Sequence, residues 1–335
     1  MPQKPLRVVH FHRKPGIACY SIERLFLDIR NAMPSDINVA VHESRFYSRG
    51  LWRRFFNIIE ASRHQGDINH ITGDVHYLAF LLNPRKTVLT IHDCGSMESS
   101  TGIKRWLLWL FWFWLPVRCV GAVTVISESS KRELLKYVDC PPEKIHIIYN
   151  CIPDWFVPSR SVFNPSCPRI LHIGSTQNKN IERIAQALVG IQCHWVVIGH
   201  LSDEKRAFIE SCGIDYENLS GLTDKALLEQ YQLADMLVFA STYEGFGLPI
   251  AEANAVGRPV VTSNLYSMPE VAGDAACLVD PYDVDSIRAG IVRVIEDQQY
   301  REHLVEAGFQ NAKRFWSATI AGQYASVYRQ MASAG

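Results

Sequence analysis

A strand–turn–helix pattern in residues 236–261 constrains the fold of this chain more than any other feature. It begins with an apolar run that predicts a buried parallel strand. Gly245 and Gly247 then predict a tight turn at which the backbone can approach a ligand closely. Pro249 suits the start of a helix, and Gly257 suits its end. Because the first N–H groups of a helix have no partner inside it, the pattern predicts a site for an anion, most simply a phosphate.

Two carboxylates accompany this turn: Glu244 precedes the glycines and Glu252 lies in the helix. A carboxylate beside a bound phosphate would be repelled, so we expect both to face other groups. Sugar hydroxyls are natural partners, because an ionised carboxylate accepts hydrogen bonds from a diol. A site for phosphate and hydroxyls together indicates a nucleotide sugar. The alternative is a helix N-terminus whose dipole merely favours acidic residues.

The rest of the chain predicts two α/β domains. Strand and helix patterns alternate in both halves, and the intervening segment is rich in proline. We place the first domain at residues 1–152, a linker at 153–168, the second domain at 169–312 and a last helical segment at 313–335. The 335 residues suffice for two cores.

The charge balance and the cysteines limit which partners, which metal sites and which cellular compartment we expect. Lys plus Arg and Asp plus Glu are equal at 34 each, which gives no reason to expect a nucleic-acid partner. The nine cysteines are scattered without a C-x-x-C pair, so we expect neither disulfides nor a zinc site. The first ten residues lack the apolar region of a signal peptide, and we expect a cytoplasmic protein.

Four positions in the first half are candidates for a ligand site or for a structural role. Gly16 follows the first predicted strand, where doubly wound domains place a ligand-facing loop, although an ordinary turn explains it equally well. Arg13 in the same loop could face a diphosphate or simply be a solvated charge. For His70 and His76 a structural role is the commoner case.

His92 and Asp93 follow the buried strand predicted at residues 87–91. Open α/β sheets place ligand groups at this end of a strand. A turn-forming His-Asp pair is the alternative, and we expect Asp93 to orient the loop or the imidazole.

Three motifs resemble the C-terminal domain of retaining glycosyltransferases of family 4. They are Glu244-Gly-Phe-Gly-Leu-Pro-Ile-Ala-Glu252, Met268-Pro-Glu-Val-Ala-Gly-Asp-Ala-Ala276 and Leu278-Val-Asp-Pro281. The resemblance implies the glycosyltransferase B-type fold, in which two Rossmann-like domains face across a cleft and the last helix returns to the first domain. It also implies transfer of a sugar, with retention, from a nucleoside diphosphate sugar to the hydroxyl of a glycan or lipid-linked acceptor in cell-surface polysaccharide or lipid-linked glycan assembly.

The same resemblance implies a role for each candidate residue. Glu244 and His92 become the catalytic candidates: Glu244 would hold the transferred sugar and support charge at its anomeric carbon, and His92 would contact the donor. Glu252 would bind the ribose hydroxyls, and Lys179 would stabilise the leaving diphosphate. The other donor-binding candidates are Gly16, Gly174, Ser175, Gly199, Gly245, Phe246, Gly247 and Leu248. We expect no metal and no cofactor beyond the donor, because a lysine and a helix N-terminus can hold phosphate without a divalent ion.

One departure from the family concerns the loop after Gly174. Family members usually supply an Arg–Lys pair to the diphosphate there. Lys179 matches the lysine, but Ser175 stands where the arginine is expected, and the loop looks one residue short. Phosphate binding would then depend on a point charge and on backbone N–H groups.

Two further segments are strongly apolar. Residues 51–64 predict a basic amphipathic helix whose apolar side chains lie mostly on one side, namely Trp52, Phe55, Phe56, Ile58 and Ile59. The ten residues from Trp106 to Leu115 are all apolar and include four tryptophans, with Lys104 and Arg105 before them. A helix of that length cannot cross a bilayer, so this segment is either buried or peripheral in the membrane interface, and we favour the interface.

Two alternatives to a transferase stay open. A sugar-nucleotide epimerase or a phosphorylase could share the same fold. A non-catalytic nucleotide-sugar-binding protein is the second alternative, and the missing arginine motivates it.

Overall fold

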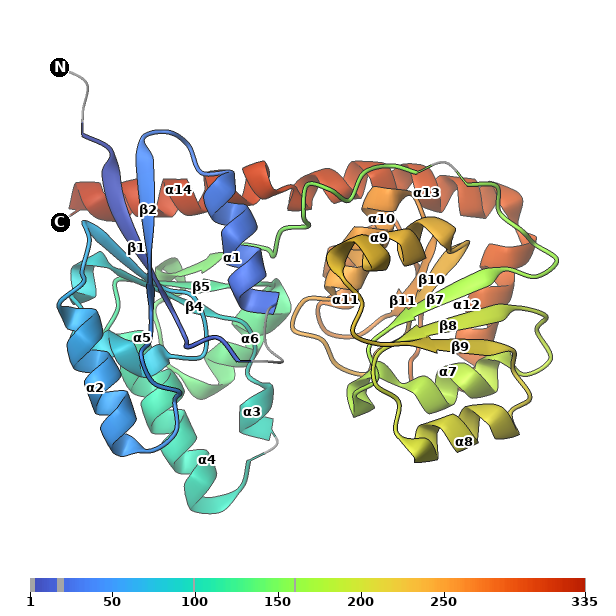
Figure 1. The fold of residues 1–335 in the computed structure, drawn as a ribbon, viewed down its shortest axis with the longest axis horizontal. Coiled ribbons are helices and arrows are strands. Elements are labelled where there is room, and N and C mark those ends of the chain that lie inside the picture. The colour runs from blue at the N-terminus through green and yellow to red at the C-terminus, as the bar shows by residue number, and fades with distance from the viewer. Residues whose placement is uncertain (1–3, 17–20, 99, 160, 335) are drawn as a thin grey trace. The chain divides into compact units, whose positions relative to one another are not determined.

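The computed structural model describes residues 4–16, 21–98, 100–159 and 161–334 (Figure 1). Its chain forms two compact units: unit 1 comprises Met1–Pro153 and Trp316–Gly335, and unit 2 comprises Asp154–Phe315. Each unit is a parallel sheet covered by helices on both faces. The predicted α/β class with two Rossmann-like domains is therefore confirmed.

Unit 1 contains a six-stranded sheet in the order β2-β1-β3-β4-β5-β6 within the described residues. Its strands are β1 (Leu6–His12), β2 (Ile37–Glu43), β3 (Ile68–Ile71), β4 (Thr87–Ile91), β5 (Ala122–Val125) and β6 (Ile145–Ile147). Its α-helices are α1 (Ser21–Asn31), α2 (Leu51–Ser62), α3 (Gly95–Glu98), α4 (Gly102–Leu108), α5 (Leu115–Arg118), α6 (Glu128–Tyr137) and α14 (Ser317–Ala334). A π-helical segment, η3 (Trp109–Trp114), joins α4 to α5.

Alternate residues of each buried strand of unit 1 face opposite helix layers. Val8 of β1 packs in a cluster with α1 and α14, whereas its neighbour Val9 packs in a cluster with α2, η3 and α5. In β4, Val88 packs in the cluster with α1 and α14, and its neighbour Leu89 packs in the cluster with α2, η3 and α5. This alternation explains why the strands read as continuous apolar runs in the sequence, because both sheet faces are covered.

Unit 2 contains a second six-stranded sheet, in the order β12-β11-β10-β7-β8-β9 within the described residues. Its strands are β7 (Arg169–Ile173), β8 (His194–Ile198), β9 (Tyr216–Leu219), β10 (Met236–Phe239), β11 (Val260–Ser263) and β12 (Cys277–Val279). Its α-helices are α7 (Ile181–Leu188), α8 (Asp203–Ser211), α9 (Asp224–Leu233), α10 (Leu248–Val256), α11 (Met268–Ala272), α12 (Val284–Glu296) and α13 (Gln298–Ala312).

The strand order reverses at one place in each sheet. In unit 2 the chain runs outward from β7 through β8 to β9 and then returns to the other side of β7 as β10. In unit 1 the same reversal separates β1 from β3. The loops that follow two such strands diverge to opposite sides, and ligands of open α/β sheets bind in the space between them. The carboxyl ends of β7 and β10 are therefore the first place to look for a site.

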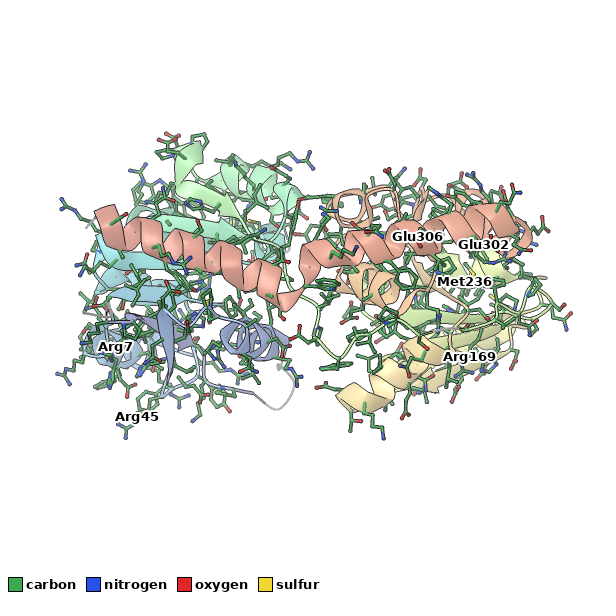
Figure 2. All side chains as sticks on the ribbon, turned by 90° about the horizontal axis from the view of Figure 1, so that it is seen from above. Arg7, Arg45, Arg169, Met236, Glu302 and Glu306 are labelled. Atoms are coloured by element: carbon green, nitrogen blue, oxygen red, sulfur yellow. The ribbon has the colours of Figure 1, made fainter. Side chains whose placement is uncertain are left out.

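The proline-rich residues 154–168 make ordered contacts within unit 2. The N–H of Ser159 donates to the carbonyl of Val256, and the N–H of Asn164 donates to the carboxylate of Asp235. Figure 2 shows the side chains of both units and the last helix α14, which belongs to unit 1.

Candidate active site

An ion pair joins the two loops at the strand-order reversal of unit 2. Lys179, after β7, places its Nζ 2.6 Å from Oε1 of Glu244, after β10. Both side chains are largely buried, at 16% and 14% exposure. The neighbouring Asn178 donates to the carbonyl of Tyr243 at 2.9 Å, which fastens the two loops together. Two predicted site residues from distant parts of the sequence thus meet at the expected sheet edge.

The turn at residues 244–247, before α10, is stabilised by a glycine conformation and by hydrogen bonds from Ser267. Gly247 has a φ of 98°, a left-handed conformation that favours glycine, and it caps the helix. The hydroxyl of Ser267 donates to the carbonyls of Glu244 and Phe246, both at 2.8 Å. Leu248 is the first helical residue, with Pro249 second. The predicted strand–turn–helix is confirmed, and Ser267 fixes it.

Gly174 and Gly199 make room for side chains of the same loop. Gly174 has a φ of 97°, and a Cβ there would lie 2.7 Å from the Cε of Lys179. A Cβ on Gly199 would lie 2.9 Å from the Oγ of Ser175. Because these two glycines have no Cβ, the side chains of Lys179 and Ser175 can pack directly against the backbone there. By contrast, a Cβ added to the predicted Gly16 would meet no atom within 4 Å, and the loop continues from Gly16 into residues outside the described ranges.

Lys205 is a site neighbour that the sequence did not reveal. It lies in the first half of α8, and its Nζ donates to the carbonyl of Ser175 at 2.6 Å. A second ammonium group therefore reaches the loop in which the family arginine is missing. Spacing on α8 could not show this, since it indicates which face a residue occupies but not which loop the side chain reaches.

Glu252 is more deeply buried than its predicted ribose contact suggests. It is only 7% exposed, and its Oε2 accepts a hydrogen bond from the hydroxyl of Tyr231 at 2.6 Å. Burial raises the pKa of Glu252 to about 7, against the opposing effect of the Tyr231 hydrogen bond. One carboxylate oxygen is thus engaged by the protein, and Tyr231 on α9 is a positioning partner that no motif indicated.

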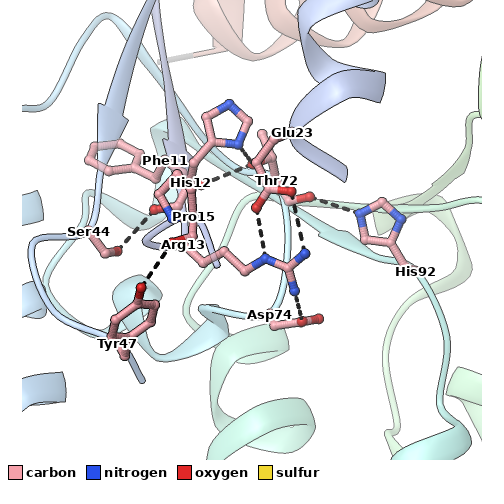
Figure 3. A network of polar contacts seen from close by, with 10 residues as sticks. All are labelled: Phe11, His12, Arg13, Pro15, Glu23, Ser44, Tyr47, Thr72, Asp74 and His92. Atoms are coloured by element: carbon pink, nitrogen blue, oxygen red, sulfur yellow. Dashed lines mark hydrogen bonds and ion pairs between the residues drawn. The ribbon is translucent and has the colours of Figure 1, made fainter. Parts of the chain in front are cut away.

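In unit 1, His92 lies at the carboxyl end of β4 (Figure 3). Its Nε2 is 2.8 Å from the carbonyl oxygen of Thr72. Because a carbonyl can only accept, Nε2 carries the proton, and burial lowers the pKa of the imidazole. Neutral His92 therefore keeps Nδ1 as an acceptor. Asp93 accepts from the N–H of Gly95 at 2.9 Å, so the prediction that it orients the loop is confirmed.

Arg13 is compensated by two carboxylates (Figure 3). Its Nε lies 2.8 Å from Glu23 and its Nη1 lies 2.8 Å from Asp74, which follows β3. The guanidinium thus bridges the loops at the strand-order reversal of unit 1. Arg13 is therefore not a solvated surface charge, which was one of the two expectations. Its positive charge is already balanced by two carboxylates.

His70 and His76 have structural roles. His70 bonds through Nδ1 to the hydroxyl of Tyr328 at 2.6 Å and through Nε2 to Thr90 at 2.7 Å. His76 contacts the carbonyl of Trp112 at 2.6 Å through Nδ1. Both rings are buried in these networks.

Metal ligation has no support among the described residues. No group of three or more His, Cys, Asp or Glu side chains is arranged to hold an ion there. In the Asp283-Val284-Asp285 sequence, Asp283 is the N-cap of α12, and its side chain accepts from the N–H of Asp285.

The tryptophan-rich segment is divided between core and surface. The indole N–H of Trp109 donates to the backbone carbonyl of Tyr137, and that of Trp112 donates to the backbone carbonyl of Asp74. Phe113 is buried. Trp106, by contrast, is 53% exposed. The segment is therefore partly buried and partly exposed, and its contact with a membrane stays a prediction. Within the described part of the chain, none of the helices has the length and apolar character needed to cross a bilayer.

Two family models match successive parts of this chain. Residues 22–155 match the model of glycosyltransferase family 4, and residues 157–311 match that of the glycosyl transferases group 1. Together they cover the N-terminal part of unit 1 from α1 to Pro153 and nearly all of unit 2, but not α14.

Curated relatives include mannosyltransferases. O-antigen chain mannosyltransferase B of Escherichia coli is 42% identical over 33% of this chain and 29% of its own length. A serotype-specific mannosyltransferase of the same species, WbdA, is 28% identical over 59% of this chain and 27% of its own length. The matched region is thus less than a third of the length of these two relatives.

Solved structures share the whole fold. The crystal structure of HepE from Anabaena in complex with UDP and glucose has a TM-score of 0.77 and 19% identity, covering 97% of this chain and 100% of that chain. WaaG, a glycosyltransferase involved in lipopolysaccharide biosynthesis, has a TM-score of 0.71 and 14% identity, covering 96% and 99%. The chain therefore belongs to the group 1, family 4 glycosyltransferases and has their B-type fold of two Rossmann-like domains.

Proposed function

We propose that this protein transfers a hexosyl group, in particular mannosyl, from a nucleoside diphosphate sugar to a hydroxyl of a growing glycan, with retention at the anomeric carbon. The mannosyl assignment is supported by the names of its E. coli relatives. A glycan-chain acceptor is supported by the name of the O-antigen chain mannosyltransferase, and attachment of that chain to a lipid is part of the proposal. A nucleoside diphosphate donor is supported by the UDP complex of HepE, a structure with the same fold.

The observation that carries the proposal is the Lys179–Glu244 ion pair beside the turn into α10. A donor carries both a diphosphate and a sugar, which require opposite properties from a site. The ammonium of Lys179 and the start of α10 would hold the diphosphate and stabilise charge on the leaving group. The carboxylate of Glu244 would accept bonds from the sugar hydroxyls and oppose positive charge developing at the anomeric carbon.

The remaining candidates keep their roles as proposals. The oxygen of Glu252 that does not bind Tyr231 would accept from the ribose hydroxyls. Ser175, Gly199 and residues 245–248 would complete the donor pocket through backbone groups. In unit 1, His92 would offer its Nδ1 to the donor. We also propose that the reaction needs no divalent metal, since cationic side chains and a helix N-terminus supply the positive charge.

A panel of donors tests this function. Thermal stabilisation and product formation are measured with mannose and glucose donors of uridine, guanosine and adenosine diphosphate, with and without chelator. The variants are Lys179→Met and Glu244→Gln, with Lys225→Met and Glu296→Gln as controls, because both control side chains are exposed on helices of unit 2. We expect one donor to stabilise the wild type, and the Lys179 variant to lose that stabilisation while the controls keep it.

Product analysis separates the transferase from the alternatives. Acceptor-dependent release of nucleoside diphosphate, with an unchanged anomeric configuration by proton NMR, supports retaining transfer. Conversion of the donor without acceptor would favour an epimerase. Stabilisation by a donor without any turnover would favour a binding protein and contradict the proposal.

A further inference from the structure

Much of the predicted apolar side of α2 is exposed, although Ile58 packs partly buried against the core. Asn57 and Ala61 form its buried face, whereas Leu51 is 82% exposed and Trp52 is 77% exposed. Phe55 and Phe56 are also about half exposed. A surface helix normally turns such side chains toward the core. The apolar side of α2 is therefore presented to the surroundings.

The start of α4 presents similar side chains. Ile103 is 78% exposed, Trp106 is 53% exposed, and Leu107 is also exposed, as is Phe111 in the following η3. The two regions are neighbours: the guanidinium of Arg54 on α2 lies 4.5 Å from the ring centroid of Trp112 in η3. Figure 1 shows α2 and α4 along the same side of unit 1. We call the exposed apolar side chains of α2 and α4 the aromatic surface.

The two sequence segments that carry the aromatic surface are rich in basic residues. Residues 44–59 contain four arginines and no acidic residue, and residues 99–127 contain three basic residues and no acidic one. The whole chain is neutral, so this local excess is a departure from its average. Arg45 is exposed and extends outward from unit 1 (Figure 2).

A hollow of about 240 Å³ adjoins the aromatic surface. It is lined by Arg45, Arg63 and His64, by the apolar side chains of Phe46, Phe56 and Ile59, and by Glu60. Two guanidinium groups beside aromatic rings suit a phosphate attached to an apolar chain. Phe56 belongs to both the hollow and the aromatic surface, so headgroup and acyl contacts would be continuous.

We propose that the aromatic surface docks unit 1 on an anionic phospholipid membrane, with Arg45 and Arg63 holding a lipid phosphate in the hollow. Tryptophan and phenylalanine flanked by Lys and Arg are the side chains that favour the membrane–water interface. This inference extends the membrane contact first expected for residues 106–115 and makes α2 a main contributor. It rests on the proposed function only for its biological purpose, since the acceptor would be lipid-linked.

Vesicle binding tests the surface without donor or acceptor. Four exposed residues are changed to serine in one variant, and four exposed residues of unit 2 are changed to serine in the control. The docking variant carries Leu51→Ser, Trp52→Ser, Ile103→Ser and Trp106→Ser. The control carries Val157→Ser, Val162→Ser, Leu233→Ser and Tyr282→Ser, all about half exposed or more. Sedimentation is measured with phosphatidylcholine vesicles and with mixed phosphatidylcholine–phosphatidylglycerol vesicles.

We expect the wild type and the control to bind the mixed vesicles, and the docking variant to bind about a hundredfold more weakly. Arg45→Gln with Arg63→Gln should weaken binding to the mixed vesicles about thirtyfold, given the contribution of each basic residue near an anionic surface. Added salt should weaken wild-type binding as well.

Three results would overturn the inference: equal binding by the docking variant and the wild type, no preference for anionic vesicles, or lipid-free self-association that the docking variant abolishes. The last would identify the surface as an interface between copies. If vesicle binding is as expected but no donor is turned over, the surface stands and the proposed function falls.

Discussion

The Nζ of Lys179 lies 2.6 Å from the Oε1 of Glu244, although 64 residues separate the two along the chain. They meet because the strands that precede them, β7 and β10, are neighbours in the sheet. Each group is the other's counter-charge in this structure. A donor with a diphosphate and a sugar would compete with this pair at both ends. Substitution of one partner should therefore change binding and turnover in different directions.

Glu244→Gln is expected to tighten binding of the free nucleoside diphosphate by about three- to tenfold, because Lys179 loses its internal acceptor and a repulsive charge disappears. Turnover should fall by about a hundredfold or more, since the carboxylate would no longer support the anomeric carbon. Calorimetry and initial rates measure the two effects. Weaker nucleotide binding by this variant would count against the competition.

Gly174→Ala should weaken donor binding through Lys179. The φ of 97° strains any residue with a Cβ, and the new methyl group would lie 2.7 Å from the Cε of Lys179. Gly213→Ala is the matched control, because Gly213 has a φ of 67° but nothing within 4 Å of the added Cβ. We expect both variants to lose about 1–2 kcal/mol of stability and only Gly174→Ala to raise the donor Kd. Equal donor affinities would show that Lys179 does not act there.

The free energy of unfolding of unit 2 should fall as pH rises through 7. Burial raises the pKa of Glu252 from 4.5 to about 7, so the folded state favours the protonated carboxyl. That stabilisation is fully present below the unfolded pKa and is lost above the folded one, a difference of about 3 kcal/mol. Glu252→Gln cannot ionise and should lack this loss. Denaturant unfolding of both proteins at pH 5 and pH 8 measures it, and parallel changes in both would refute the assignment.

Unit 1 should respond to pH in the opposite direction. Burial holds the pKa of His10 and of His70 well below the ordinary value, and lowers that of His12 to about 4. Neutral imidazoles therefore stabilise the fold above pH 6.5, and this stabilisation is lost as pH falls toward 4. Both His10 and His70 contact the hydroxyl of Tyr328. Amide-exchange protection of α14, corrected for intrinsic rates, should drop on acidification, and unchanged protection would argue against the network as the cause.

Tyr328→Phe tests the same network at constant pH. It removes only the hydroxyl, which leaves the buried nitrogens of His10 and His70 without that partner. We expect a loss of about 1–3 kcal/mol in the free energy of unfolding. Arg329→Ala is the neighbouring control, since its ion pair with Asp36 is exposed and should contribute little to stability. Similar losses in both variants would contradict the buried network.

Much of the fold could be predicted because the core imposes strong local patterns. The apolar run at residues 236–240 became β10, and the glycines and Pro249 placed α10 within one residue. The meeting of Lys179 with Glu244 followed from the rule that loops cluster at the carboxyl ends of adjacent parallel strands. These signals are local, or follow from general topology.

Contacts made by long side chains across elements could not be predicted. Lys205 reaches Ser175 from another helix, and Tyr231 reaches Glu252 in the same way. The sequence of α2 also misled in one respect, since an amphipathic pattern shows which side chains share a side but not which side faces the core. In α2 the buried positions are Asn57 and Ala61.

The position of α14 has a consequence for synthesis on the ribosome. The strands of unit 1 are translated first, but α14, which covers one face of their sheet, is translated only after all of unit 2. Until then His10 and His70 lack Tyr328, and only α1 of the two helices in this cluster covers the apolar face of the nascent sheet. Unit 2 can thus complete its fold before the unit that precedes it, so the order of translation and the order of completion are reversed.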